Sequence, residues 1–259
     1  MARLKGQNWP SRTGQVRIYA VDGWQEADRP VAVFLPGAHR TAHCHGDWYD
    51  ILKDDAEVVL LDLPGHGGSD PIRPATVKAM AEAVHDVLSA ACAGRKVLLV
   101  GESLGGTIGL YLGAQESPGP VRAVFAAEPP LTTTKLWPLS ASWERSFADP
   151  EQFAFNCDLA RDTFGLQPDG RINERIYYPL IGAARLPTMI VAGDEPLMPI
   201  RELTFCPSLM DAVDRFAIER LDPGTVTFRQ LTGCGHLVLD QARAQCGPLI
   251  RQMIAEHLK

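Results

Sequence analysis

The segment 96–115 constrains the fold of this chain more than any other. Lys96 to Val100 is a short run of mostly apolar residues, which predicts a buried strand. The next five residues read Gly-Glu-Ser-Leu-Gly, and from Gly106 the sequence continues as an apolar helix. A serine at the apex of such a strand-turn-helix needs small neighbours, because larger side chains would collide with nearby backbone. The pattern therefore predicts that Ser103 is a nucleophile on a tight turn.

Short apolar runs alternate with helical stretches along much of the chain. The predicted strands are 16–21, 31–35, 57–63, 96–101, 121–127, 187–193 and 225–231, and the predicted helices include 75–92 and 237–258. This alternation predicts an α/β fold with a mostly parallel central sheet and helices on both faces. We expect 16–21 to be an edge strand and Pro248 to kink or divide the last helix. Reactive groups should gather beyond the carboxyl ends of the strands.

Residues 131–185 interrupt the alternation, because they contain no clear strand and are rich in aromatic residues. We expect one domain, with a core of 1–130 and 186–259 and a small helical lid inserted between these parts. Large aromatic side chains mostly serve packing, but they also line apolar substrate pockets. Trp137 and Trp143 are therefore candidate substrate-binding residues.

The composition excludes several classes of partner. The 259 residues carry a net charge of −6 without a basic cluster, which argues against a nucleic-acid partner. No apolar stretch is long enough to cross a bilayer, so no membrane association is expected. The amino-terminal residues lack a secretory apolar segment, and the six scattered cysteines fit free thiols in the cytoplasm. The oligomeric state cannot be read from the sequence.

Four motifs in order carry a resemblance to a known family. They are Leu35–Ala38 after the first buried strand, Asp62–Asp70 (DLPGHGGSD), the turn at Ser103, and Gly233–His236 after the last strand. In these motifs the chain resembles the α/β-hydrolase fold family. The resemblance implies a catalytic serine, acid and histidine in that order along the chain. It also implies that the Asp62–Asp70 loop shapes the structure rather than taking part in the chemistry.

A serine hydroxyl needs a base to accept its proton, and the base needs an acid to orient it. The resemblance assigns the base to His236. Three carboxylates are candidates for the acid. Asp194 directly follows the 187–193 strand and is the first choice, Glu195 takes its place if the loop is aligned on Pro199, and Glu128 follows the 121–127 strand.

The negative charge that develops on the substrate oxygen needs two hydrogen-bond donors. We expect them to be the backbone N–H groups of Ala38 and Leu104, as in the family. His39 and Glu102 flank these positions and are candidates to lie beside the substrate.

The sequence predicts neither a metal nor an organic cofactor. His39, His43 and His45 are close in sequence, but no carboxylate-histidine metal pattern surrounds them. No phosphate-binding glycine loop or nucleotide motif is present either.

These residues predict a serine hydrolase that cleaves a carboxylic ester, thioester or lactone of a small molecule through an acyl-enzyme on Ser103. The serine nucleophile argues against dehalogenase and epoxide hydrolase chemistry, which would use an aspartate. Two alternatives remain open: an acyltransferase or lyase on the same scaffold, and a non-catalytic binding protein of this fold.

Overall fold

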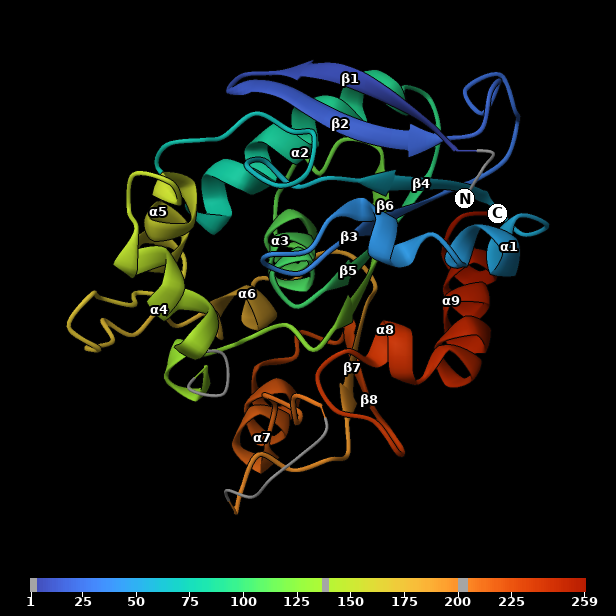
Figure 1. Cartoon of the computed structure of the whole chain (residues 1–259). Helices are drawn as coiled ribbons and strands as arrows, with labels where there is room; N and C mark the ends of the chain where they lie inside the picture. The colour runs from blue at the N-terminus through green and yellow to red at the C-terminus, as the bar shows by residue number, and fades with distance from the viewer. Residues whose placement is uncertain (1–3, 137–139, 200–204) are drawn as a thin grey trace.

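The computed structural model describes residues 4–136, 140–199 and 205–259. Within them, one eight-stranded sheet has the order β1-β2-β4-β3-β5-β6-β7-β8 (Figure 1). The strands β3 to β8 run parallel, whereas β1 and β2 are antiparallel to their neighbours. The strand bounds are β1 Lys5–Ser11, β2 Gly14–Ala20, β3 Val31–Leu35, β4 Glu57–Leu61, β5 Val97–Glu102, β6 Val121–Ala127, β7 Thr188–Gly193 and β8 Val226–Leu231. The predicted fold class, a mostly parallel sheet between helices, is confirmed.

Two apolar cores lie on the two faces of the sheet. Strand β3 is fully buried because its side chains alternate between the two cores. Val31, Val33 and Leu35 face one core, whereas Ala32 and Phe34 face the other. The helices α2 (Val77–Ala91), α3 (Leu104–Gly113), α6 (Pro179–Gly182) and α7 (Ala212–Leu221) contribute to the first core. The helices α1 (Trp48–Leu52), α8 (Val238–Gln241) and α9 (Arg243–His257) contribute to the second.

Two local expectations need correction. The 16–21 segment forms β2, but it is not an edge strand, because β1 pairs outside it. Strand β1 has a polar sequence and contains Pro10, which an edge strand tolerates because its free side needs no ladder hydrogen bond. The carboxy-terminal helix is divided at Ala242, between α8 and α9, whereas Pro248 lies inside α9.

The segment between β6 and β7 contains α4 (Ser140–Ala148), α5 (Ala154–Asp162) and α6. Its helices α4 and α5 lie together at one side of the molecule (Figure 1). Hydrogen bonds tie the segment to the chain before α2: Thr163 Oγ1 donates to the Ala75 carbonyl at 2.5 Å, and Ala75 N–H donates to Asp162 Oδ2 at 2.9 Å. The segment is thereby held against the core. No described helix has the length and apolarity needed to cross a membrane.

Candidate active site

The turn at Ser103 joins β5 directly to α3 and has the strained backbone that the sequence predicts. Ser103 has φ 53° and ψ −116°, in a region where a non-glycine residue costs on the order of 1–3 kcal/mol. Two flanking glycines make the turn possible. A Cβ on Gly101 would lie 2.2 Å from the Gly105 carbonyl oxygen, and a Cβ on Gly105 would lie 2.3 Å from that of Leu35. The turn therefore requires glycine at both positions.

His236 lies beside Ser103, in the loop between β8 and α8. Its Nε2 is 3.0 Å from Ser103 Oγ. Its backbone N–H donates to the Cys206 carbonyl oxygen at 2.9 Å, which fixes the loop. Both side chains are buried: Ser103 is 8% exposed and His236 is 3% exposed. The structure thus brings together the serine and the histidine that the sequence singled out.

The carboxylate that contacts His236 is Glu128, at the end of β6. Its Oε2 is 3.3 Å from His236 Nδ1 and also accepts a hydrogen bond from Leu209 N–H at 2.9 Å. Its Oε1 accepts from Gly193 N–H at 2.8 Å and from Ser208 Oγ at 2.6 Å. An ionised carboxylate only accepts hydrogen bonds, so His236 must donate from Nδ1 and present a lone pair at Nε2 to the Ser103 hydroxyl. These contacts therefore select one histidine tautomer.

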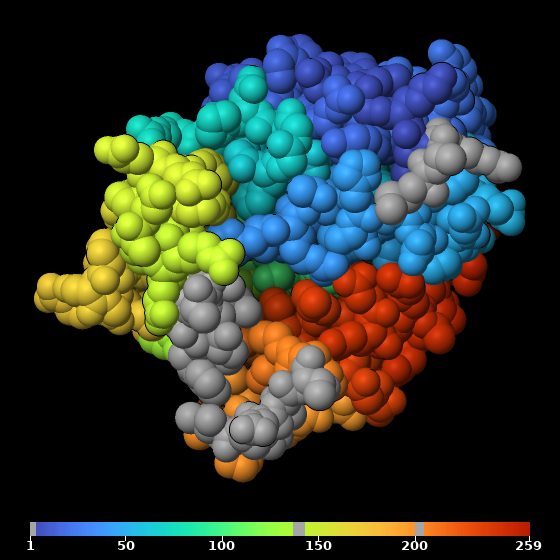
Figure 2. Space-filling view, viewed as in Figure 1, coloured from blue at the N-terminus to red at the C-terminus, as the bar shows by residue number. Residues whose placement is uncertain are grey.

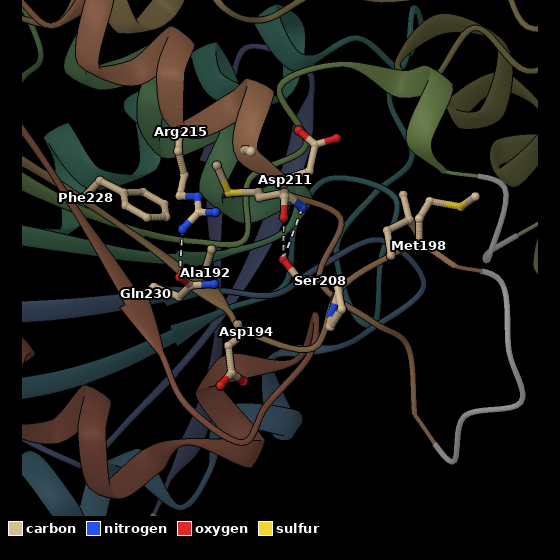
Figure 3. Close-up of a pocket in the computed structure, with 13 residues that line it drawn as sticks. Ala192, Asp194, Met198, Ser208, Asp211, Arg215, Phe228 and Gln230 are labelled. Atoms are coloured by element: carbon tan, nitrogen blue, oxygen red, sulfur yellow. Dashed lines mark hydrogen bonds between the residues drawn. The ribbon is translucent and has the colours of Figure 1, made fainter.

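Asp194 and Glu195 lie elsewhere, and the preference for Asp194 needs correction. Asp194 is exposed, and its Oδ1 accepts a hydrogen bond from Cys234 N–H at 3.3 Å. The backbone of Glu195 donates to the Cys234 carbonyl at 3.0 Å. Both residues follow β7, which is one strand further from Ser103 than β6. Asp194 instead borders a separate hollow of about 300 Å³ beside β7 and α7, and its carboxylate points away from Ser208 (Figure 3).

The turn after β3 lies directly against Ser103. A Cβ on Gly37 would be 3.2 Å from the Ser103 Cβ. Arg40 N–H donates to the Gly37 carbonyl at 3.3 Å, which closes a turn with Ala38 and His39 at its centre. His39 has φ 60°, a second strained non-glycine residue at the site. Ala38 therefore lies next to Ser103, and Leu104 N–H, the first of α3, is a donor that the helix leaves unpaired.

The loop 62–70 supports this turn. Asp62 is fully buried, and its Oδ1 accepts from Ala42 N–H at 2.6 Å, just beyond Arg40. Its Oδ2 accepts from Gly68 N–H at 2.9 Å. The Asp62 carboxylate thus links the backbone at Ala42 to the backbone at Gly68. This link fits the structural role implied for the loop.

Comparison with known proteins decides the family. A model of the alpha/beta hydrolase family matches residues 32–246. The chain belongs to the alpha/beta hydrolase family. No curated protein matches the chain.

Solved structures share the whole fold of this hydrolase-family chain at low sequence identity. Naproxen esterase (carboxylesterase NP) from Bacillus subtilis is 16% identical over 97% of this chain and 91% of its own, with a TM-score of 0.69. VinJ is 15% identical over 98% of this chain and 99% of its own, with a TM-score of 0.72. E-2-(Acetamidomethylene)succinate hydrolase is 19% identical over 97% of this chain and 99% of its own, with a TM-score of 0.70. Likeness at these identities concerns the fold alone.

A cavity of about 190 Å³ opens on Ser103 and His236 in this alpha/beta hydrolase. Most of its wall is apolar. Its lining comprises Gly37, Ala38, His39, Arg40, Glu102, Ser103, Leu136, Trp143, Phe164, Cys206, His236 and Leu237. In Figure 2 the blue turn after β3, the red chain after β8 and the yellow-green insertion meet around a small green area, the colour of residues near 105. The cavity thus lies where three distant parts of the sequence meet.

The candidate substrate-binding residues His39, Glu102 and Trp143 all line this cavity, whereas Trp137 lies outside the described residues. The Trp143 ring contacts that of His39, with centroids 4.2 Å apart, and that of Phe164 at 5.0 Å. Burial of the His39 ring in the cavity wall and, to a lesser extent, the charge of nearby His66 together lower the pKa of His39 to about 4, although the residue as a whole is exposed. His39 therefore faces the cavity as a neutral imidazole at neutral pH.

Glu102 is fully buried and forms an ion pair with Arg40. Burial raises the pKa of the Glu102 carboxyl, and the positive charge of Arg40 opposes that rise. Arg40 Nη2 also donates to Asp240 Oδ2 at 2.5 Å. Four lining residues were not predicted from the sequence: Arg40, Leu136, Phe164 and Cys206. A basic residue two positions after the predicted oxyanion donor was the available signal for Arg40.

The described residues contain no cluster of three or more histidines, cysteines or carboxylates arranged to hold a metal ion. All six cysteines are described and are free thiols.

Proposed function

We propose that this chain is a serine hydrolase that cleaves a carboxylic ester, thioester or lactone through an acyl-enzyme on Ser103. The observation that carries the proposal is the hydrogen-bonded chain from Ser103 Oγ through His236 to Glu128. Each group has the partner that its role requires: the serine has a base, and the base has a buried carboxylate. The carboxylesterases among the structures of similar fold support an ester as the substrate.

In the first half-reaction, Ser103 Oγ attacks the carbonyl carbon of the substrate while His236 Nε2 takes the hydroxyl proton. Glu128 stabilises the resulting imidazolium through its contact with Nδ1. The N–H groups of Ala38 and Leu104 donate to the oxygen on which negative charge develops. When the tetrahedral intermediate collapses, His236 returns the proton to the departing alcohol or thiol, and the acyl group stays on Ser103.

In the second half-reaction, water replaces the leaving group. His236 Nε2 takes one proton from the water as its oxygen attacks the acyl carbon. The carbon–oxygen bond to Ser103 then breaks, and the proton passes to Ser103 Oγ. The product is a carboxylic acid, and the enzyme regains its starting protonation state.

The substrate we propose has a largely apolar acyl group. The cavity at Ser103 is lined by the apolar side chains of Leu136, Trp143 and Phe164. Leu136 and Trp143 also border a second, larger cavity of about 560 Å³ within the 131–185 segment. We propose that this segment acts as a lid, with Trp143 on α4 closing one side of the substrate site.

A fluorophosphonate probe tests the proposal, because it forms a stable bond only with an activated serine. Wild-type protein should acquire one covalent label, and folded Ser103→Ala protein should acquire none, as measured by intact mass. Ester and lactone panels should then show turnover in the wild type only. Absence of labelling in folded wild-type protein would contradict the proposal. Product analysis with and without an added alcohol separates hydrolysis from acyl transfer.

A further inference from the structure

The Arg40 side chain joins three segments that surround Ser103. Arg40 belongs to the turn after β3, and it pairs with Glu102, the residue immediately before Ser103. Its other nitrogen pairs with Asp240 on α8, in the segment that follows His236. Its two partners lie far from it in sequence, Glu102 by 62 positions and Asp240 by 200. One guanidinium therefore links the turn, the nucleophile and the histidine loop.

The turn that Arg40 ends is strained and needs external support. His39 has φ 60°, and such a conformation persists only when the surrounding contacts hold it. The ring of His39 rests on Trp143, and the next residue is held by the two ion pairs of Arg40. Gly37, at the other end of the turn, packs against Ser103. A shift of Arg40 would therefore move Ala38 relative to Ser103.

Stability alone does not account for a charge at position 102. All six residues of β5 are buried, and an apolar side chain at its last position would fit the rest of the strand. Burying a carboxylate carries a large desolvation cost, and an apolar replacement of a buried ion pair is often neutral or stabilising. A buried pair can instead select one arrangement of the segments that it joins. The Glu102–Arg40 ion pair joins the turn after β3 to the residue before Ser103.

We propose that Arg40 is a positioning residue that holds the Ala38 N–H against the reacting carbonyl oxygen by anchoring the 37–40 turn to Glu102 and Asp240. This inference rests on the proposed serine hydrolase function. Arg40 does not transfer a proton or form a bond to the substrate. Its loss should weaken transition-state stabilisation while leaving substrate binding largely intact, because the oxyanion contact strengthens as charge develops.

The test compares Arg40→Met with Arg243→Met. Arg243 is a matched control because it also pairs with Asp240, at 3.3 Å, whereas its other ion pair in the described part of the chain is with Asp47 rather than with Glu102. Arg40→Met should lower kcat about 10- to 100-fold, since loss of one oxyanion donor costs about 10²–10³ and the turn is displaced rather than removed. Its KM should change by less than about threefold, and affinity for a boronic-acid transition-state analogue should fall in parallel with kcat. Arg243→Met should keep kcat within about twofold.

The double variant Arg40→Met/Glu102→Leu separates positioning from folding, since it removes both members of the buried pair. It should regain the thermal stability lost in Arg40→Met but not the lost kcat. Recovery of kcat together with stability would overturn the proposal, as would equal activity of Arg40→Met and Arg243→Met. A wild type that neither labels nor turns over esters would overturn the proposed function, and this inference with it.

Discussion

The carboxyl ends of β6 and β7 each carry a carboxylate, and only one of them reaches His236. Glu128 after β6 is fully buried and accepts four hydrogen bonds, one of them from His236. Asp194 after β7 is exposed, and its Oδ1 accepts a hydrogen bond from the backbone N–H of Cys234. The end of β7 instead supplies Gly193 N–H to Glu128. Hydrogen-bond partners and strand order therefore determine which carboxylate meets His236, whereas position after the penultimate strand does not.

The largest expected loss of kcat comes from changing Glu128, and the largest contrast is with the same change at Asp194. Glu128→Gln should lower kcat by about 10³–10⁴, because an amide nitrogen facing His236 would favour the tautomer that cannot accept from Ser103. Asp194→Asn, its matched control, should change kcat by less than about threefold. Steady-state ester hydrolysis measures both, with thermal unfolding to show that each variant is folded. A large loss in Asp194→Asn with little in Glu128→Gln would reverse the comparison.

The second largest loss of kcat is expected at Gly193, which precedes Asp194 in the chain and donates its N–H to Glu128. A Cβ at this position would lie 2.3 Å from the Cys234 carbonyl oxygen and 2.5 Å from that of Gly235. Gly193→Ala should therefore displace the backbone that leads to His236 and lower kcat about 100-fold, a loss typical of small misplacements of catalytic groups. Gly247→Ala in α9 is a control for adding a methyl group, because its Cβ would meet only ordinary van der Waals contacts, at 3.7 and 3.8 Å. Unchanged kcat in Gly193→Ala would show that the histidine loop tolerates the shift.

The sequence predicts the parts of this site that local chemistry determines. Ser103 and His236 could be found because glycines mark their turns within a few residues. The carboxylate that meets His236 could be narrowed only to Asp194, Glu195 or Glu128, because Glu128 meets His236 across 108 positions and only the strand order brings them together. Its φ of 51°, which turns the chain at the end of β6, has no glycine to signal it. Arg40 was missed for the same reason, since both of its acidic partners are remote in sequence.

A smaller effect is expected when Glu128 loses one supporting donor. Ser208 Oγ donates to Glu128 Oε1, and Ser208→Ala removes that hydrogen bond while Gly193 and Leu209 remain. The variant should lower kcat about tenfold, in line with losses of outer contacts at catalytic sites, and the free energy of unfolding by about 1–2 kcal/mol. Ester kinetics and urea unfolding measure the two quantities. An undiminished kcat would show that two backbone donors suffice to orient the acid.

The smallest expected effect extends the comparison from carboxylates to histidines. His45 is as buried as His236 but, in the described part of the chain, has no hydrogen bond to a carboxylate. Burial, together with the positive charge of nearby Arg40, lowers the pKa of His45 to about 3, whereas an unfolded chain has a histidine pKa of about 6.5.

Between about pH 6.5 and pH 3 the unfolded state therefore binds a proton at His45 that the folded state does not. Stability should fall as the pH is lowered through this range, by up to about 1.4 kcal/mol per pH unit from this residue. His45→Leu should reduce that slope even if the variant is less stable overall at pH 7.5, because leucine does not titrate. Urea unfolding at pH 7.5, 6.5 and 5.5 measures the slope in both proteins. Equal slopes would mean that His45 gains a proton in the folded state, and that burial without a carboxylate partner does not keep this histidine neutral.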